Sequence, residues 1–592
     1  MPAKRLHEPL PPRVRAAASR RTCGAGSTRA QRGSVAVIVA LFMTVVIAAL
    51  GALDVGNVFF ARRSMQRIAD LAALAGAQRM DSTCTQPSLT ATENAAANGF
   101  TANGSGQTIT IVCGRWDIKD NSGPSYFSTG NANTPWNAVQ VTVTRTVPYF
   151  FLGPSRQVNA TATAQATDIG AFTIGTTLAQ LQGGLVNSLL NSLLGANLNL
   201  SLVSYESLAS ARVKIRDLMA AAGASTVSDL LSTQVSAAQL ANLMSSALAR
   251  TTVPDANLQA DLATLQAIAN SGISNAVQFP IGNGAGAPGL LSLSVPDLQS
   301  TLDATISPLD GLVVAAEIAR AGQAPMDIAA GLNIGGLGAT LKVQIIEPPV
   351  LAVGEAGVDP VTGTWRTQAH TAQVRLYLKI ALGTPSLPLL GSLGVDLPVA
   401  LEAVPGQAWL EATHCLPSAA TSTSVVGVQP GIANVCVGDW PANPPASQPF
   451  TCTVPATLVN AGLITVTANA AIPAVVPLAS ASSLTFDGIS GNADDYQSAN
   501  SNAAGGVLAN ALSGLSASLA QPNGLTINLR GHGLPLGSIA SALVTFLSPV
   551  LDVVLAGIDQ AVDPLLQLLG VQVSVATIHD LSLTCGASQL VN

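Results

Sequence analysis

The sequence predicts a membrane-anchored α+β protein, with a single N-terminal transmembrane helix that continues as a stalk into a β-rich exported body with a helical insertion. Three observations support this fold class. Residues 35–53 form one unbroken apolar run, strand-like runs separated by Gly- and Pro-rich loops dominate the residues after 81, and a block at 173–271 has helical spacing. The predicted parts are a tail at 1–33, a span and stalk at 34–80, a β-rich domain at 81–168 and a large α+β body at 169–592.

The span is predicted from nineteen residues, Val35 to Leu53, in which Thr44 is the only polar side chain. At about 1.5 Å per residue, a helix of this length crosses a hydrocarbon core of roughly 30 Å. A cleaved signal peptide is the alternative, but its apolar region is usually about 7–15 residues long. The segment Asp54-Val55-Gly56 is not a clear cleavage site, so we expect an uncleaved anchor.

The direction of the span follows from the basic residues on its two sides. Residues 1–33 carry eight Lys or Arg against one acid, Glu8. Within about 20 residues of the span, five arginines precede it and three follow it. Basic residues remain on the cytoplasmic side, so the tail is predicted to be cytoplasmic and the body exported.

The cysteines agree with this direction. Cys23 precedes the span, and an even number follows it, as expected for disulfides in an oxidising compartment. Cys84 and Cys113 form the obvious local pair, whereas the other four allow three pairings that the sequence does not resolve. The six predicted disulfide cysteines are Cys84, Cys113, Cys415, Cys436, Cys452 and Cys585.

The helix is predicted to continue past the membrane, from Ser34 to Arg79, because residues 61–79 contain no Pro and carry apolar side chains at helical spacing. Small residues four apart, including Ala72 and Gly76, permit a close approach of another backbone. This face packs either against a helix of another subunit or against the protein's own body, and the sequence leaves both interpretations open.

Asp54 lies at the end of the span and needs an explanation. It is either solvated, paired with Arg62 on the same helix, or in contact with another subunit of an assembly. The sequence does not choose among these possibilities.

In the body, strand-like runs recur beyond residue 282, and the apolar segment 542–570 is predicted to be an amphipathic helical hairpin because Pro and Asp interrupt it. The loop at 486–497 has the oxygen ligands for Ca²⁺ but not the spacing of an EF-hand.

The composition and motifs exclude several classes of function. The body carries 14 basic and 29 acidic side chains over residues 81–592, so nucleic acid is not an expected partner. The sequence has no phosphate-binding loop with its Lys-Ser/Thr, no Gly-x-Ser-x-Gly elbow and no zinc-type Cys or His spacing. We therefore predict no enzyme activity, no catalytic residue, no cofactor and no metal.

Residues 32–78 and 139–167 resemble the N-terminal region of the TadG-like proteins of the Tad (Flp) tight-adherence pilus system. The resemblance is carried by Arg32-Gly33-Ser34, Asp54-Val55-Gly56, a nearby Phe59 or Phe60, "ADLAALAGAQ" from Ala69, and Pro148-Tyr149-Phe150-Phe151. It implies a bacterial inner-membrane anchor, a periplasmic body, and contacts with membrane lipid and other Tad assembly proteins. The candidate contact residues within the matching motifs are Asp54, Gly56, Asp70 and Gly76.

The resemblance also has a limit. Pilins of this system are cut after a Gly that lies five residues before a Glu, but the fifth residue after Gly33 is Ile38. Prepilin-peptidase processing is therefore not expected. The function predicted is a non-enzymatic component of Tad pilus assembly that anchors or scaffolds the machinery, and the alternative is an envelope adhesin or hydrolase that shares only the anchor region.

Overall fold

The computed structural model describes residues 34–591 with gaps. The residues left out are 82, 103–105, 119–120, 130–135, 152, 176–182, 253–256, 273–275, 285–286, 296–300, 335, 360–361, 388–390, 417, 442, 476–479, 501–513, 516, 520, 522–523, 530–531, 534–540, 543–544, 548, 551–553, 555–574 and 587. The chain forms two compact units, one made of Met1–Arg63 with Thr146–Val158 and the other of Ser64–Arg145 with Asn159–Asn592.

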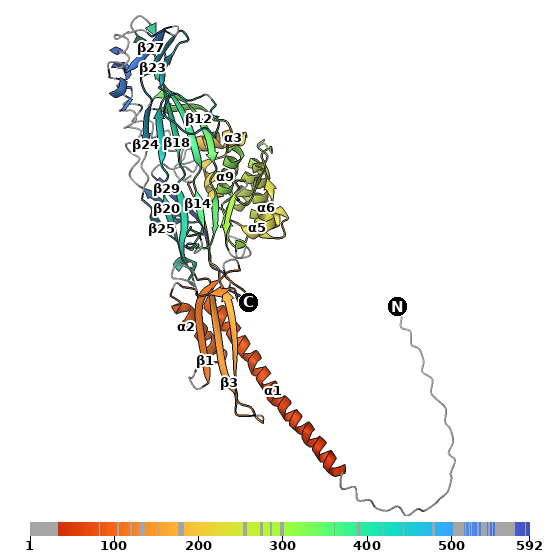
Figure 1. The fold of residues 1–592 in the computed structure, drawn as a ribbon. Helices are drawn as coiled ribbons and strands as arrows, with labels where there is room; N and C mark the ends of the chain where they lie inside the picture. The colour runs from red at the N-terminus through yellow and green to blue at the C-terminus, as the bar shows by residue number, and fades with distance from the viewer. Residues whose placement is uncertain are drawn as a thin grey trace, which may run out of the picture. The chain divides into compact units, whose positions relative to one another are not determined.

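Helix α1 (Ser34–Ala77) is a single helix of 44 residues, drawn in red in Figure 1. It confirms the predicted continuous helix and ends two residues before the expected Arg79. Over the span its side chains are exposed, including Ile38, Leu41 and Phe42. Apolar side chains without protein neighbours fit a lipid environment. Within the described chain, α1 is the one helix long and apolar enough to cross a membrane.

The end of α1 belongs to a small α/β domain in the second unit. A five-stranded sheet has the order β2-β1-β3-β4-β30, and helix α2 (Thr85–Ala97) joins α1 in forming one core with it (Figure 1). The strands are β1 (Gln107–Trp116), β2 (Phe127–Ser128), β3 (Ala138–Val147), β4 (Arg156–Gln165) and β30 (Gln589–Val591).

The core that α1 shares with α2 and the sheet explains the small residues of α1. Ala69, Ala72 and Ala73 are fully buried and pack with Ala91 of α2 and Val139 of β3. The small-residue face therefore packs against the protein's own body, the second of the two interpretations above. The last third of α1 is a structural part of this domain and not a free stalk.

Helix α2 was not predicted, and it adds to the strands expected at 81–168. Its sequence, TQPSLTATENAAA, carries Pro87 and several Thr and Ser residues that are typical of loops. Pro87 lies in the first turn of the helix, where its missing N–H has no intrahelical acceptor in any case.

The predicted helical block is present. Thr226 and Ser236 each form a capping box at the start of their helices, with Asp229 and Gln239 respectively. The helices of the block are α3 (Gly183–Leu194), α4 (Leu202–Ser210), α5 (Ile215–Ala222), α6 (Val227–Ser232), α7 (Ala237–Leu248) and α8 (Leu258–Ala269). A further helix, α9 (Pro308–Arg320), lies beyond the predicted block and was not expected. Two-residue strands lie between or beside them: β6 (Val213–Lys214), β7 (Gln234–Val235), β8 (Phe279–Pro280) and β10 (Thr305–Ile306).

The largest sheet is antiparallel and has the order β11-β12-β15-β18-β21-β24. Its apolar face shares the main hydrophobic core with the helices α3–α9. Its strands are β11 (Met326–Ile334), β12 (Leu337–Glu347), β15 (Gln373–Gly383), β18 (Val395–Ala403), β21 (Ala433–Val437) and β24 (Ile472–Val475).

Two further sheets pack face to face around a separate core that contains Phe172, Leu410 and Phe486. One has the order β26-β29-β5-β13-β9 and the other β14-β19-β20-β25. Their strands are β5 (Ile169–Ile174), β9 (Leu291–Ser294), β13 (Leu351–Gly354), β26 (Tyr496–Asn500), β29 (Val575–Thr584), β14 (Gln368–His370), β19 (Gln407–His414), β20 (Thr423–Gln429) and β25 (Ser482–Asp487).

The remaining strands form a small sheet of β22 (Thr457–Asn460), β23 (Ile464–Ala468), β27 (Leu525–Leu529) and β28 (His532–Gly533), and a pair of β16 (Ser386–Leu387) and β17 (Gly391–Ser392). The predicted helical hairpin at 542–570 falls largely outside the described residues. The fold is the expected α+β body behind one apolar helix.

Candidate functional site

The first unit contains the contact that explains Asp54. Asp54 lies on α1 one residue after the apolar run and is fully buried, although its neighbours Leu53 and Val55 are exposed. Its Oδ1 accepts a hydrogen bond from the backbone N–H of Phe150 at 2.7 Å, and its Oδ2 accepts one from the N–H of Phe151 at 2.9 Å. Two charge-assisted bonds to backbone donors hold a carboxylate firmly.

The donors come from the turn between β3 and β4, which we call the PYFF turn (residues 148–151). Pro148 has no N–H and a fixed φ, so the chain leaves β3 without an unpaired donor at that position. The amides of Phe150 and Phe151, two and three residues further on, donate to Asp54. The structure thus gives Asp54 two backbone partners where the sequence suggested solvent, Arg62 or another subunit. The motifs were visible in the sequence, but their contact was not.

The other candidate contact residues lie in different surroundings. Gly56 is exposed, and an added Cβ would meet nothing within 4 Å. Asp70 is half-buried and accepts a hydrogen bond from Gln66 Nε2 at 2.7 Å. Gly76 is buried, and a Cβ there would lie 3.1 Å from the carbonyl oxygen of Pro87 and 3.3 Å from Val139. Gly76 serves the internal packing of α1, whereas Gly56 remains open to a partner.

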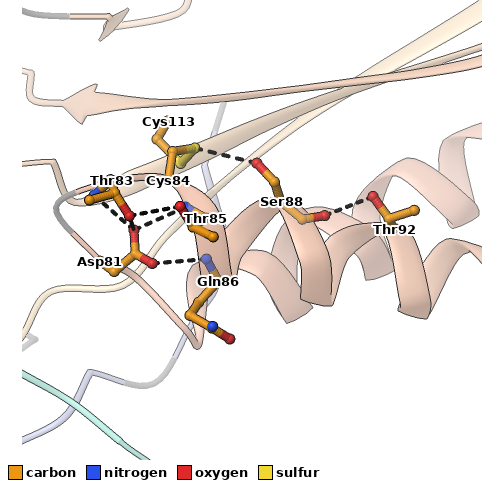
Figure 2. Close-up of a disulfide and its surroundings, with 8 residues drawn as sticks. All are labelled: Asp81, Thr83, Cys84, Thr85, Gln86, Ser88, Thr92 and Cys113. Carbon is orange, nitrogen blue, oxygen red and sulfur yellow. Dashed lines mark hydrogen bonds between the residues drawn. A yellow bond between two sulfur atoms is a disulfide. The ribbon is translucent and has the colours of Figure 1, made fainter.

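The disulfide between Cys84 and Cys113 joins the start of α2 to β1, as the sequence predicts for this local pair. Figure 2 shows Asp81 beside it, where its carboxylate accepts hydrogen bonds from the backbone N–H groups of Thr83, Thr85 and Gln86. Partial burial opposes the ionisation of Asp81, but these bonds outweigh it and lower its pKa. The start of α2 is fixed by both features.

The structure resolves the other pairing as Cys415 with Cys585 and Cys436 with Cys452. In the described part of the chain, Asp168, Cys415 and Cys585 place three potential ligand atoms within 4.8 Å of one another. The two sulfur atoms are bonded to each other and are not thiolates, so this group does not have metal-ligand chemistry. Burial raises the pKa of Asp168 to about 6, and Gly586 donates its N–H to the carboxylate at 3.1 Å.

A buried ion cluster lies between the small domain and the sandwich of the body. Arg115 Nη2 on β1 is 2.9 Å from Asp117 and 2.7 Å from Glu355, which follows β13. Asn137 Nδ2 also contacts Glu355, at 3.4 Å. An adjacent cavity of about 230 Å³ is lined by Arg115, Asn137, Asp168 and Glu355 among others. No motif in the sequence indicated this cluster.

A second buried cluster has residue types used in acid–base catalysis. His579 Nδ1 is 2.7 Å from Asp310 Oδ2, and His579 Nε2 is 3.1 Å from Arg212 Nη2, which is also paired with Asp495. Both imidazole nitrogens therefore have partners. All four side chains are buried, and the cluster holds β29 to the helices.

A single apolar N-terminal helix followed by this body defines a membrane-anchored α+β protein. Residues 33–79 match the family model described as Flp pilus-assembly TadE/G-like, and residues 75–164 match the one described as Tad-like Flp pilus-assembly. These two matches cover residues 33–164 and support a Tad-like Flp pilus-assembly protein by that part of the chain. Residues 182–317 match the model of a domain of unknown function. No curated protein and no solved structure matches the chain.

Proposed function

We propose that this protein is a non-enzymatic, inner-membrane-anchored scaffold of Flp pilus assembly, with a cytoplasmic N-terminal tail and a periplasmic body of the TadG-like type. The observation that carries the proposal is the continuity of α1. Helix α1 covers residues 34–77 of the TadE/G-like match at 33–79, and its last third is part of the core of the domain matched by the second model. The same helix therefore belongs to both the span and that domain.

The body supports a scaffold role because its charged clusters are used internally. Arg115, Arg212 and Arg375 are each buried against acidic partners. The charge of each arginine is thus matched by an acid inside the protein, as in a structural ion pair. The partners in this proposal are membrane lipid and other pilus-assembly proteins.

The role is tested by electron microscopy of surface pili in a deletion strain and in the same strain with an intact copy restored. We expect pili to be lost on deletion and to return on restoration. Unchanged pili would contradict the assembly role and would favour an envelope adhesin or hydrolase that shares only the anchor.

The orientation has its own test, since the other six cysteines form disulfides and Cys23 is the one remaining thiol in the sequence. A membrane-impermeant maleimide applied to spheroplasts is expected to label Cys23 only after the membrane is permeabilised. The control is Val203→Cys in a Cys23→Ser background, because Val203 on α4 is 72% exposed. We expect this variant to be labelled without permeabilisation, and the reverse pattern would contradict the orientation.

A further inference from the structure

The PYFF turn has the features of a second membrane contact. Its two phenylalanine side chains are 67% and 55% exposed at Phe150 and Phe151, although apolar side chains of this size are usually buried. Their backbone N–H groups donate to Asp54, so the backbone that carries the two exposed rings is bonded to α1. An exposed aromatic pair on a backbone that is bonded to a helix indicates a surface that contacts a partner.

The position of Asp54 along α1 identifies that partner. Asp54 lies about 28 Å along the helix from Val35, which is close to the roughly 30 Å thickness of the hydrocarbon core. The residue that anchors the turn is therefore at the boundary of the core when the span is inserted. Because the turn is bonded to Asp54, it lies at the same boundary.

Other side chains of the first unit extend the same surface. Phe59 and Phe60 on α1 are 65% and 76% exposed and lie about 8–9 Å beyond Asp54 along the helix. This is the depth of the headgroup layer, where aromatic side chains are enriched. Arg62 and Arg63 follow and are exposed, at a depth where they reach lipid phosphates.

The two hydrogen bonds explain why an acidic residue occupies position 54. Backbone N–H groups that enter the membrane boundary lose water and must be paired within the protein. A carboxylate supplies one acceptor oxygen to each of the two amides, and the amides in turn compensate the carboxylate for its lost hydration. The buried carboxylate and the two buried amides therefore depend on each other for their hydrogen bonds.

We propose that the PYFF turn inserts Phe150 and Phe151 into the interfacial layer of the same bilayer that α1 crosses, with Asp54 as the latch that holds it there. The inference rests on the proposed membrane anchor. It gives the protein two points of attachment to one membrane surface, and it assigns to Asp54 the role of a positioning residue for a lipid contact.

The test uses the full-length chain in vesicles of equimolar phosphatidylcholine and phosphatidylglycerol. In a Cys23→Ser background, Phe150→Cys is labelled with the environment-sensitive fluorophore NBD, and Val203→Cys is the labelled control. We expect the probe at 150 to show blue-shifted emission and at least threefold stronger quenching by nitroxide lipids than the probe at 203. Equal emission and quenching at the two positions would overturn the inference.

A second variant tests the latch. Asp54→Ala in the Phe150-labelled protein is expected to reduce lipid quenching at least twofold, whereas Asp327→Ala, which removes an exposed acid on β11, should leave it unchanged. Unaltered quenching in Asp54→Ala would overturn the role of Asp54. Carbonate washing distinguishes a failure of the proposed membrane anchor from a failure of the proposed lipid contact. Loss of the protein from the vesicles would contradict the membrane anchor. A retained protein with a water-exposed probe would contradict only the lipid contact of the PYFF turn.

Discussion

Arg115 and Glu355 are 240 residues apart in the sequence, and their side chains form a buried ion pair at 2.7 Å. Arg115 belongs to the domain matched by the pilus-assembly model, and Glu355 belongs to the sandwich of the body. The pair is supported by Asp117 and Asn137. The cluster joins the small domain to the sandwich, and the pairing of β30 with β4 joins the small domain to the last strand. The disulfide Cys415–Cys585 joins the end of β19 to the end of β29.

Removing Arg115 should destabilise the junction strongly. Arg115→Met leaves Asp117 and Glu355 buried without this cation, and breaking a buried pair from one side costs about 3–5 kcal/mol. The matched control is Arg216→Met, whose pair with Asp303 is about half exposed and should cost less than about 1 kcal/mol. Urea unfolding of the detergent-solubilised chain, followed by tryptophan fluorescence, measures both, and equal losses would show that burial does not determine the difference.

Gly56 and Gly76 of α1 should respond in opposite ways to substitution by leucine. Gly76→Leu places side-chain atoms against Pro87 and Val139, and overpacking of this kind costs roughly 1–3 kcal/mol. Gly56→Leu adds a better helix former at a position where an added Cβ meets nothing within 4 Å. The free energy of unfolding should therefore stay unchanged or rise slightly. If Gly56 contacts another subunit, this second variant should also reduce the number of surface pili, and normal pili would remove Gly56 from the candidate contacts.

The long elements of the fold were predictable because they depend on local patterns. An unbroken apolar run followed by apolar side chains at helical spacing sufficed for α1, and β-branched runs sufficed for β1 and β3. Helix α2 was missed because its Pro, Thr and Ser residues have the same composition as a loop, and its helical conformation is fixed by packing against α1 and by the disulfide at Cys84.

The contacts of the candidate site were not predictable, for a different reason. Asp54 and Phe150 were both noted in the sequence, but their 96-residue separation is bridged only once β3 and β4 are paired. The small-residue face of α1 was evident, yet its periodicity does not say which backbone it approaches. The pairing of Cys415 with Cys585 likewise depends on β19 and β29 ending side by side, which is a property of the tertiary structure.

The distal disulfides should differ in how much they stabilise the protein. Cys415–Cys585 closes a loop with a sequence separation of 170, and Cys436–Cys452 one of 16. Loop-closure entropy then predicts a loss of about 5 kcal/mol on replacing the first pair by alanine and about 3 kcal/mol for the second. Chemical denaturation of the two double variants under non-reducing conditions gives the comparison. The reverse order would mean that residual structure in the unfolded chain, rather than loop length, controls the effect.

Glu317 should make the stability of the body fall as the pH rises. It lies fully buried on α9, and among the described residues neither of its carboxyl oxygens has a hydrogen-bond partner. Burial raises its pKa well above the ordinary value of 4.5. Below pH 4.5 the group is neutral in both the folded and the unfolded chain, so it has no effect on the balance. Above that pH the unfolded chain releases the proton while the folded chain keeps it, which favours unfolding by roughly 1.4 kcal/mol per pH unit up to the folded pKa.

The variant Glu317→Met removes this titration at nearly constant volume. The free energy of unfolding of the variant should therefore exceed that of the wild type more at pH 7.5 than at pH 4, because only the wild type carries this raised pKa. Urea midpoints of the two proteins at each pH give this difference, and the effects of all other titrating groups cancel in it. A difference that is the same at both pH values would show that Glu317 titrates alike in the folded and unfolded chain, with a charge partner that compensates its burial.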